Sequence, residues 1–361
     1  MQVFRGYQHP ALASPCALTI GNFDGVHRGH QAMLALLRNE AQHRSLPACV
    51  MTFEPHPREY FSPTSAPARI STLRDKLTEL ARCGVDQAVV LPFNARLARQ
   101  SPEAFISEVL VKGLRASYLL VGDDFRFGAK RAGDYAMLNA AGEAQGFEVA
   151  RMNSYEISDP HARLRHAAPR GGAPALGRSG GGPGFRVSSS AVREALALGR
   201  MDDAARLLGR PYSISGHVVH GRKLGRELGF RTLNLRFSHW RSAASGIFAV
   251  HVHGLAKQPL VGVANRGVRP SLDARDVNAG RVLLETHCLD WPSGLGQDGA
   301  YGKIIRVELL HKLHDELKYD GLDALRAGIA RDCEEARAFF AAPLSASKHT
   351  ETSRQTTRDQ I

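Results

Sequence analysis

The sequence predicts two domains, an α/β domain with a doubly wound parallel sheet followed by an antiparallel β domain. The chain has 361 residues, more than one ordinary hydrophobic core holds. Residues 16–150 alternate short apolar runs with helical patterns, which is typical of a parallel sheet covered by helices. From Ser213 onward the runs are short, several alternate, and Gly, Pro or Asn turns separate them, which favours an antiparallel barrel or sandwich.

In the first domain, the apolar runs predict four buried strands and the periodic segments predict three helices. The strands are expected at 16–20, 48–53, 87–93 and 118–122, and the helices at 30–44, 73–84 and 102–114. Ligands of such sheets bind beyond the carboxyl ends of the strands. The segment "GNFDG" directly follows the first strand, so we expect it to line a binding site.

The middle of the chain contains a connection that differs from both domains. Residues 159–186 are rich in Gly, Pro and Arg, which predicts a flexible insertion. Helix returns over 188–210, and 210–212 ("RPY") indicates a hinge between the domains. We therefore place the domains at 1–209 and 210–341.

The second domain is predicted to contain six strand-like runs and a closing helix. The runs are 213–221, 231–237, 246–254, 260–265, 281–291 and 302–313, the helix is 321–340, and 342–361 is expected to be a disordered tail.

Composition narrows the class of protein. The formal net charge is +12, yet no basic, aromatic-rich strand or recognition helix stands out, so nucleotides and phosphorylated small molecules are favoured over nucleic acid. No apolar run has the roughly 20 residues of a membrane span, and the first residues lack a signal-peptide pattern. The five scattered cysteines argue against a disulfide framework or a zinc finger. We expect a cytoplasmic protein without a membrane partner.

His27 and His30 lie at the predicted start of a helix, directly after the first strand. A pair three residues apart could bind a metal, or could be two ordinary surface histidines. The third interpretation is phosphate recognition, because a helix N-terminus offers free N–H groups and a partial positive charge. Gly25 and Gly29 would let backbone approach a ligand, and the histidines could donate to phosphate oxygens as charge develops.

The stretch "GNFDGVHRGH" (21–30) resembles the signature of nucleotidyltransferases with a His-x-Gly-His motif. Its longer form resembles the family of bacterial bifunctional riboflavin kinase/FMN adenylyltransferases (FAD synthetases). Six further stretches are similar to the same family in the same order. They are "TFEPHPREYF" (52–61), "VGDDFRFGAKRAGD" (121–134), "VSSSAVREAL" (187–196), "GHVVHGRKLGRELGF" (216–230), "GVANRGVRPSL" (262–272) and "LLETHCLDW" (283–291).

The resemblance implies that a Rossmann-like nucleotidyltransferase domain joins FMN to the AMP part of ATP and releases pyrophosphate. His27 and His30 would then contact the ATP phosphates. Ser188, Ser189 and Arg193 would converge on the leaving pyrophosphate. Nucleotide or flavin contacts are implied for Gly21, Asn22, Phe23, Asp24, Gly29, His56, Asp124, Phe125 and Arg126.

For the second domain, the resemblance implies a six-stranded β-barrel that transfers the γ-phosphate of ATP to riboflavin. The chain has no Walker A motif, and the glycines spaced four apart in "GRKLGRELG" favour a loop close to phosphates. Oxygen-bearing Thr232 and Asn234 are the expected Mg²⁺ ligands, and Glu285 is the expected base for the riboflavin hydroxyl. Further ligand contacts are expected at Gly221, Lys223, Gly225 and Asn265.

Three residues of the second domain depart from the usual family pattern. Arg231 and Leu233 replace the Pro and Ala of Phe-Pro-Thr-Ala-Asn, and His314 replaces the Arg of Leu-Arg-Asp-Glu. These changes leave open an FMN adenylyltransferase whose barrel only binds flavin. A basic nucleic-acid-binding protein with a nucleotidyltransferase-like fold is also open, as is adenylylation of a different small substrate. The sequence makes no prediction of oligomeric state.

Overall fold

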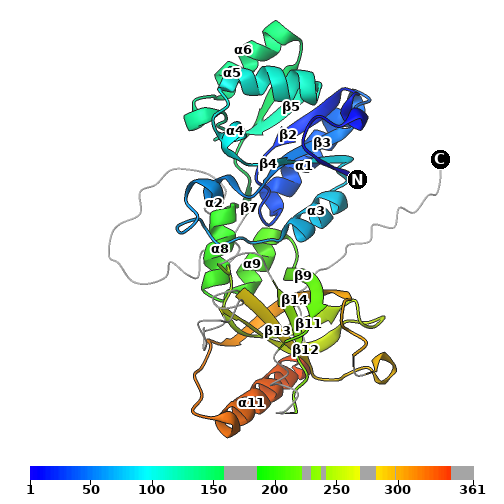
Figure 1. The fold of residues 1–361 in the computed structure, drawn as a ribbon, viewed down its shortest axis with the longest axis vertical. Coiled ribbons are helices and arrows are strands. Elements are labelled where there is room, and N and C mark those ends of the chain that lie inside the picture. The colour runs from blue at the N-terminus through cyan, green and yellow to red at the C-terminus, as the bar shows by residue number, and fades with distance from the viewer. Residues whose placement is uncertain (158–184, 222–228, 237–240, 269–281, 297, 343–361) are drawn as a thin grey trace, which may run out of the picture.

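A computed structural model describes residues 1–157, 185–221, 229–236, 241–268, 282–296 and 298–342. The predicted insertion, except for its last two residues, and the predicted tail beyond 342 lie outside the described residues, as do Lys223 and Gly225. Figure 1 shows the N-terminal sheet with its helices at one end, a barrel at the other, and two helices between them. Within the described residues, no helix has the length and apolar character needed to cross a membrane.

The N-terminal domain is built on a parallel sheet with the strand order β1-β4-β3-β2-β5-β6. The strands are β1 (Gln2–Arg5), β2 (Cys16–Ile20), β3 (Ala48–Glu54), β4 (Gln87–Pro92), β5 (Ala116–Gly122) and β6 (Glu148–Met152). The four predicted strands are confirmed, and β1 and β6 are added at the two edges. The chain runs from β2 outward to β4 and returns to the other side of β2 as β5. The strand order therefore reverses between β2 and β5, where such sheets bind ligands.

Helices connect the strands of this sheet, and the three predicted helices are present. The helices of this domain are α1 (Arg28–His43), α2 (Pro57–Phe61), α3 (Leu73–Arg82), α4 (Ala95–Ala98), α5 (Pro102–Ala104), the π-helix η2 (Phe105–Gly113) and α6 (Tyr135–Gln145), with the 3₁₀ turns η1 (Pro10–Leu12) and η3 (Ala129–Arg131). The segment predicted as one α-helix over 102–114 is a short α-turn followed by a π-helix. Its apolar residues show which side is buried, but do not distinguish α from π winding.

The helical stretch predicted over 188–210 is two helices, α8 (Ser189–Ala197) and α9 (Met201–Leu208). Gly199 breaks it with φ of 68°, in the left-handed region. Ser188 is the N-cap of α8, and its Oγ accepts the Ala191 N–H at 3.2 Å. The short antiparallel pair β7 (Glu156–Ile157) and β8 (Phe185–Arg186) precedes α8, so the predicted insertion ends in a strand.

The C-terminal domain is a closed antiparallel barrel with the order β10-β13-β12-β11-β14-β9, as the family resemblance implies. Its strands are β9 (Tyr212–Val219), β10 (Leu233–Arg236), β11 (Gly246–His253), β12 (Leu260–Val268), β13 (Val282–Cys288) and β14 (Ile304–His314), with the 3₁₀ turn η4 (Ser293–Leu295) before β14. Phe248 and Val250 point into the barrel core. Ile247 and Ala249 alternate with them and pack outside against Cys333 of α11 (Leu322–Ala341).

Helices α8 and α9 share a hydrophobic core with the barrel. Val192, Leu196 and Leu207 are buried in the same cluster as Ile214 and Leu309 of the barrel strands. In Figure 1 the two helices lie between the sheet and the barrel. Helix α9 packs on both α8 and the barrel strands β9 and β14, so it connects the motif on α8 to the barrel.

Candidate active sites

The loop after β2 is folded around the carboxylate of Asp24, which is 3% exposed. Asp24 Oδ1 accepts the backbone N–H groups of Ile70 and Ser71, both at 3.1 Å, and the Ser71 hydroxyl at 3.2 Å. The Ser71 Oγ in turn accepts the Gly25 N–H at 3.1 Å. A buried carboxylate needs such donors, and these contacts join the loop to the segment before α3.

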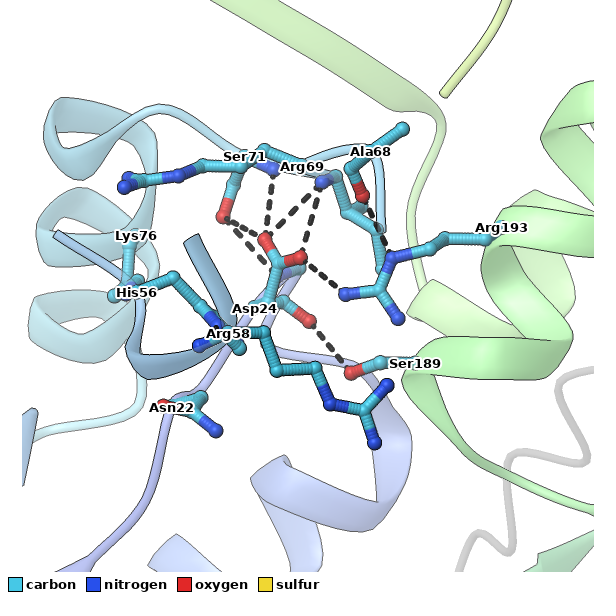
Figure 2. Close-up of polar contacts among 12 residues, drawn as sticks. Asn22, Asp24, His56, Arg58, Ala68, Arg69, Ser71, Lys76, Ser189 and Arg193 are labelled. Atoms are coloured by element: carbon cyan, nitrogen blue, oxygen red, sulfur yellow. Dashed lines mark hydrogen bonds and ion pairs between the residues drawn. The ribbon is translucent and has the colours of Figure 1, made fainter. Parts of the chain in front are cut away.

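Two residues of α8 reach the same carboxylate and its backbone, as Figure 2 shows. Arg193 forms an ion pair with Asp24 Oδ2 at 2.6 Å and donates through Nε to the Ala68 carbonyl at 2.7 Å. The Ser189 hydroxyl donates to the Asp24 carbonyl oxygen at 3.1 Å. The two predicted phosphate motifs are thus brought together across 165 positions of sequence. Ser189 and Arg193 have protein partners here, which fixes where they lie at the site.

The histidine pair is tightly arranged at the start of α1. His27 is the N-cap of this helix, and its Nδ1 accepts the His30 N–H at 3.3 Å. An accepting Nδ1 places the proton of a neutral ring on Nε2. The two rings stack with centroids 3.7 Å apart. Within the described part of the chain, the buried Nδ1 of His30 has no hydrogen-bond partner.

Both histidines are held in the neutral form. Burial lowers the pKa of His27 to about 4, although Asp24 partly opposes the shift. Burial also lowers the pKa of His30 well below its usual value, and His27 and Lys76 add to this shift. Among the described residues, no group of three or more His, Cys, Asp or Glu side chains is placed to hold a metal. Neutral imidazoles at a helix start fit hydrogen-bond donation to phosphate.

The backbone of this loop is strained. Phe23 and Val26 have φ of 47° and 41°, and Gly25 has φ of 83°. A Cβ on Gly25 would lie 2.7 Å from Cγ2 of Ile70, so this glycine is required by packing within the protein. The Phe23 side chain is 1% exposed and contacts the His30 ring at 4.9 Å between centroids. Phe23 therefore supports His30 from the core.

Glycines flank the loop at both ends. A Cβ on Gly21 would lie 3.0 Å from the Phe23 ring, and one on Gly29 would lie 3.3 Å from the His27 ring. The Asn22 side chain is exposed, while its carbonyl oxygen accepts the Thr52 hydroxyl at 3.2 Å.

The end of β3 brings a third group of residues to the site. His56 is the N-cap of α2, and its Nδ1 accepts the Arg58 N–H at 3.1 Å. Burial lowers the pKa of His56 to about 4, so this ring is also neutral. Arg69 anchors the same turn through a bidentate ion pair with Glu54, at 2.7 and 2.8 Å, and a second ion pair with Glu59.

Sequence reasoning missed Lys76, which is 3% exposed and lies close to the site. Its Nζ donates to Thr52 Oγ1 at 3.4 Å. Burial lowers the pKa of Lys76, and the negative charge of Asp24 opposes this. A signal was present in the sequence, because Lys76 lies four residues before the buried Leu80 on α3. A charged residue on the apolar stripe of a helix is unusual.

The loop after β5 lies at the other side of the strand-order reversal. Asp124 and Arg126 are exposed there, and Arg126 pairs with Asp134 at 3.2 Å. Phe125 stacks on Phe127 with ring centroids 5.7 Å apart. The loop is anchored by Asp123, which was not predicted and which accepts the Ser154 hydroxyl at 2.7 Å. A ligand can therefore reach the side chains of Asp124 and Arg126.

The barrel brings three predicted residues side by side. Asn234 of β10 is directly opposite Glu285 of β13, and Glu285 is directly opposite Asn265 of β12. Residues opposite one another in antiparallel strands share a face. Leu233 and Leu235 point into the barrel core, so this row lies on the outer face.

The side-chain amides of Asn234 and Asn265 in this row have buried or closely packed atoms. Asn234 is 6% exposed, and its Nδ2 donates to the Thr232 carbonyl at 3.4 Å. A Cβ on Gly221 would lie 2.5 Å from Asn234 Nδ2, so the glycine lets the chain pass closely over this amide. The buried Oδ1 of Asn265 has no hydrogen-bond partner among the described residues.

The unusual Arg231 is held at both its side chain and its backbone. Its guanidinium lies over the Trp291 ring at 4.6 Å, and its carbonyl accepts from His287 Nδ1 at 2.7 Å. These contacts fix the residue directly before Thr232.

The two halves of the chain match two protein-family models. Residues 9–162 match the FAD synthetase model, and residues 208–340 match the riboflavin kinase model. The bifunctional riboflavin kinase/FMN adenylyltransferase of Escherichia coli (strain K12) is 44% identical over 343 residues, covering 94% of this chain and 98% of the relative. The chain belongs to the bifunctional riboflavin kinase/FMN adenylyltransferase family.

Further members of the family give the same result. The bifunctional riboflavin kinase/FMN adenylyltransferases of Haemophilus influenzae and Pseudomonas fluorescens are 40% and 42% identical, over 94% and 90% of this chain and 99% and 93% of their own lengths. A crystal structure described as a macrolide-efflux protein from Streptococcus pneumoniae aligns with a TM-score of 0.64 over 93% of this chain and 99% of that one. Its identity is 24%, so it shows a shared fold alone.

Proposed function

We propose that this family member phosphorylates riboflavin on its barrel and adenylylates FMN at the loop around Asp24, with ATP as the donor for both steps. The observation that carries the adenylyl assignment is the meeting of the His27/His30 loop with Ser189 and Arg193 of α8. The reaction needs no enzyme nucleophile, because an FMN phosphate oxygen attacks the α-phosphorus of ATP. Positioning and charge neutralisation are the tasks left to the protein.

At the adenylyl site, each group has a distinct role. His27 donates from Nε2 to the ATP phosphates, and His30 lies stacked beside it. Arg193 neutralises the leaving pyrophosphate, and Asp24 acts by fixing the Arg193 guanidinium. Asp24 itself would repel phosphate, so its contribution is positional. His56, Asn22 and the exposed residues after β5 contact the nucleotide or flavin.

At the kinase site, Glu285 accepts the proton of the riboflavin hydroxyl. The neighbouring Thr232 and Asn234 would hold Mg²⁺, since their oxygens are the hard donors this ion prefers. Once bound with ATP, Mg²⁺ supplies charge neutralisation on the phosphates. Asn265 Oδ1 is a buried acceptor without a partner among the described residues, which suits contact with the riboflavin hydroxyls.

We also propose that the protein works in the cytoplasm. All five cysteines are free thiols, which suits the reducing cytoplasm, and the substrates are small molecules. We place the boundary between the modules at residues 209 and 210.

The test follows riboflavin, FMN and FAD by chromatography, starting once from riboflavin and once from FMN, with ATP and Mg²⁺. FMN followed by FAD from riboflavin supports both assignments. The variant Glu285→Gln should make no FMN from riboflavin but should make FAD from added FMN at the wild-type rate. FAD formed only from added FMN by the wild type would contradict the kinase assignment and leave a barrel that binds flavin.

A further inference from the structure

Arg210, which precedes the first barrel strand, reaches back to the loop that carries the histidine pair. Its guanidinium donates to the Gly25 carbonyl at 2.8 Å, the Val26 carbonyl at 3.2 Å and the Leu208 carbonyl at 3.1 Å. Its Nε pairs with Glu79 of α3 at 3.2 Å. A planar guanidinium suits this arrangement because its donors are fixed in several directions. The segment predicted as a hinge thus contains a side chain that fastens two parts of the molecule.

A second side chain makes matching contacts from α1. Gln31 Nε2 donates to the Val26 carbonyl at 2.8 Å and to the Leu208 carbonyl at 2.7 Å. Gln31 and Arg210 therefore bridge the same two carbonyls. The Val26 carbonyl receives two donors, which is the full capacity of a carbonyl oxygen.

These contacts fall on a strained part of the backbone. Val26 is a β-branched residue with φ of 41°, and strained residues persist only where their surroundings over-determine them. The next residue is His27, whose ring caps α1 and stacks on His30. A change at Arg210 would thus be transmitted through one peptide unit to the group proposed to contact ATP.

We propose that Arg210 is a positioning residue for adenylyl transfer, supplied to that site from the start of the kinase module. This rests on the proposed function of the histidine loop. Arg210 lies in the region that matches the riboflavin kinase model, whereas Val26 and His27 lie in the region that matches the FAD synthetase model. The adenylyl site is therefore completed by a side chain counted with the other domain.

The test is the variant Arg210→Lys in the full-length chain. Lysine keeps a charge for Glu79, but its three N–H groups on one nitrogen cannot serve Glu79 and three carbonyls together, as the five N–H groups of the guanidinium do. We expect kcat for FMN to FAD to fall about 10- to 100-fold, as small misplacements of a reacting group do, with KM for ATP and FMN changed less than about threefold. Riboflavin phosphorylation by the same preparation should stay within about twofold of wild type.

The matched control is Arg206→Lys on α9, an arginine whose side chain is 48% exposed and which pairs with Asp203 at 3.7 Å. It should leave both activities unchanged. Should Arg210→Lys fail to fold, Gln31→Leu carries the test, with a loss in the same activity alone. A wild type that forms no FAD overturns the proposed function and this inference together. If the wild type forms FAD, two results for Arg210→Lys would overturn this inference only. One is FAD formation as fast as in the wild type, and the other is equal impairment of FAD formation and riboflavin phosphorylation.

Discussion

His314 Nε2 lies 2.8 Å from Asp332 Oδ1, so the last barrel strand is paired with a buried carboxylate of α11. Burial lowers the pKa of His314, but its hydrogen bond to the Asp315 carbonyl and the bond and charge of Asp332 together raise it above the usual value. Folding thus shifts the histidine that replaces the usual arginine towards its protonated, positively charged form. The pair holds α11 against the barrel.

The stability from this pair should depend on pH. Because the folded pKa of His314 is raised, its contribution is complete below the unfolded value of about 6.5 and is lost as pH rises through the folded value. We expect His314→Gln to lower Tm more at pH of about 6 than at pH of about 9. Thermal unfolding at both pH values measures this, with the exposed His43→Gln as the control. An equal loss at both pH values would contradict the pairing.

His27 should give the opposite pH dependence. Its folded pKa is about 4 and its unfolded pKa is about 6.5, so the unfolded chain binds an extra proton between these values. The free energy of unfolding should therefore decrease as pH falls from about 6.5 towards about 4. In His27→Gln, denaturant unfolding should show a shallower decrease over this window. A variant with the same slope as wild type would show that the ring is not buried neutral.

Asp24→Asn tests whether the charge of Asp24, rather than its shape, positions Arg193. The amide has the same shape, but it loses the charge that pairs with Arg193 at 2.6 Å. We expect FAD formation to fall at least about 10-fold, because Arg193 is no longer fixed, and riboflavin phosphorylation to persist. Glu108→Gln is the control, since it removes a carboxylate from an exposed helical pair with Lys112. A folded Asp24→Asn protein with wild-type FAD formation would show that this ion pair is dispensable.

His30→Ala should abolish most FAD formation from FMN and leave phosphorylation of riboflavin nearly intact. The physical reason is that His30 stacks on His27 and lies at the start of α1, whereas the Asn234–Glu285–Asn265 row is on the outer face of the barrel. Rates of both steps on one preparation measure this. Equal loss of both activities in folded protein would mean that the sites are not separate.

Arg231→Ala should weaken the kinase alone. Removing the guanidinium from Trp291 costs about 0.5–1 kcal/mol for an exposed cation–π contact, or roughly two- to fivefold in rate or affinity at Thr232. Arg231→Pro restores the usual family residue and should retain wild-type phosphorylation, because proline also fixes the backbone. The kinetics of riboflavin phosphorylation decide this, and a proline variant weaker than the alanine variant would contradict it.

The central strands of the parallel sheet could be predicted from the sequence, whereas its edge strands could not. Strand β2 falls at the predicted residues, since a strand buried on both faces is a continuous apolar run. Strand β6 was missed because its residues are half-buried or exposed. At the site, the chemistry of Ser189 and Arg193 could be predicted, but their attachment to Asp24 could not. Contacts across 165 positions depend on tertiary packing that no local pattern encodes.

The core that α8 and α9 share with the barrel limits how such a chain can be divided. A gene that encoded the adenylyl module alone, cut before β9, would remove the strands β9 and β14 against which α9 packs, and would expose apolar residues of α9 such as Leu207. Apolar surface of this kind promotes aggregation or association. A free-standing version of the module would therefore need polar replacements on these helices, or a new partner to cover them. In the joined chain, the barrel covers α9, and α9 packs against the helix that carries Ser189 and Arg193.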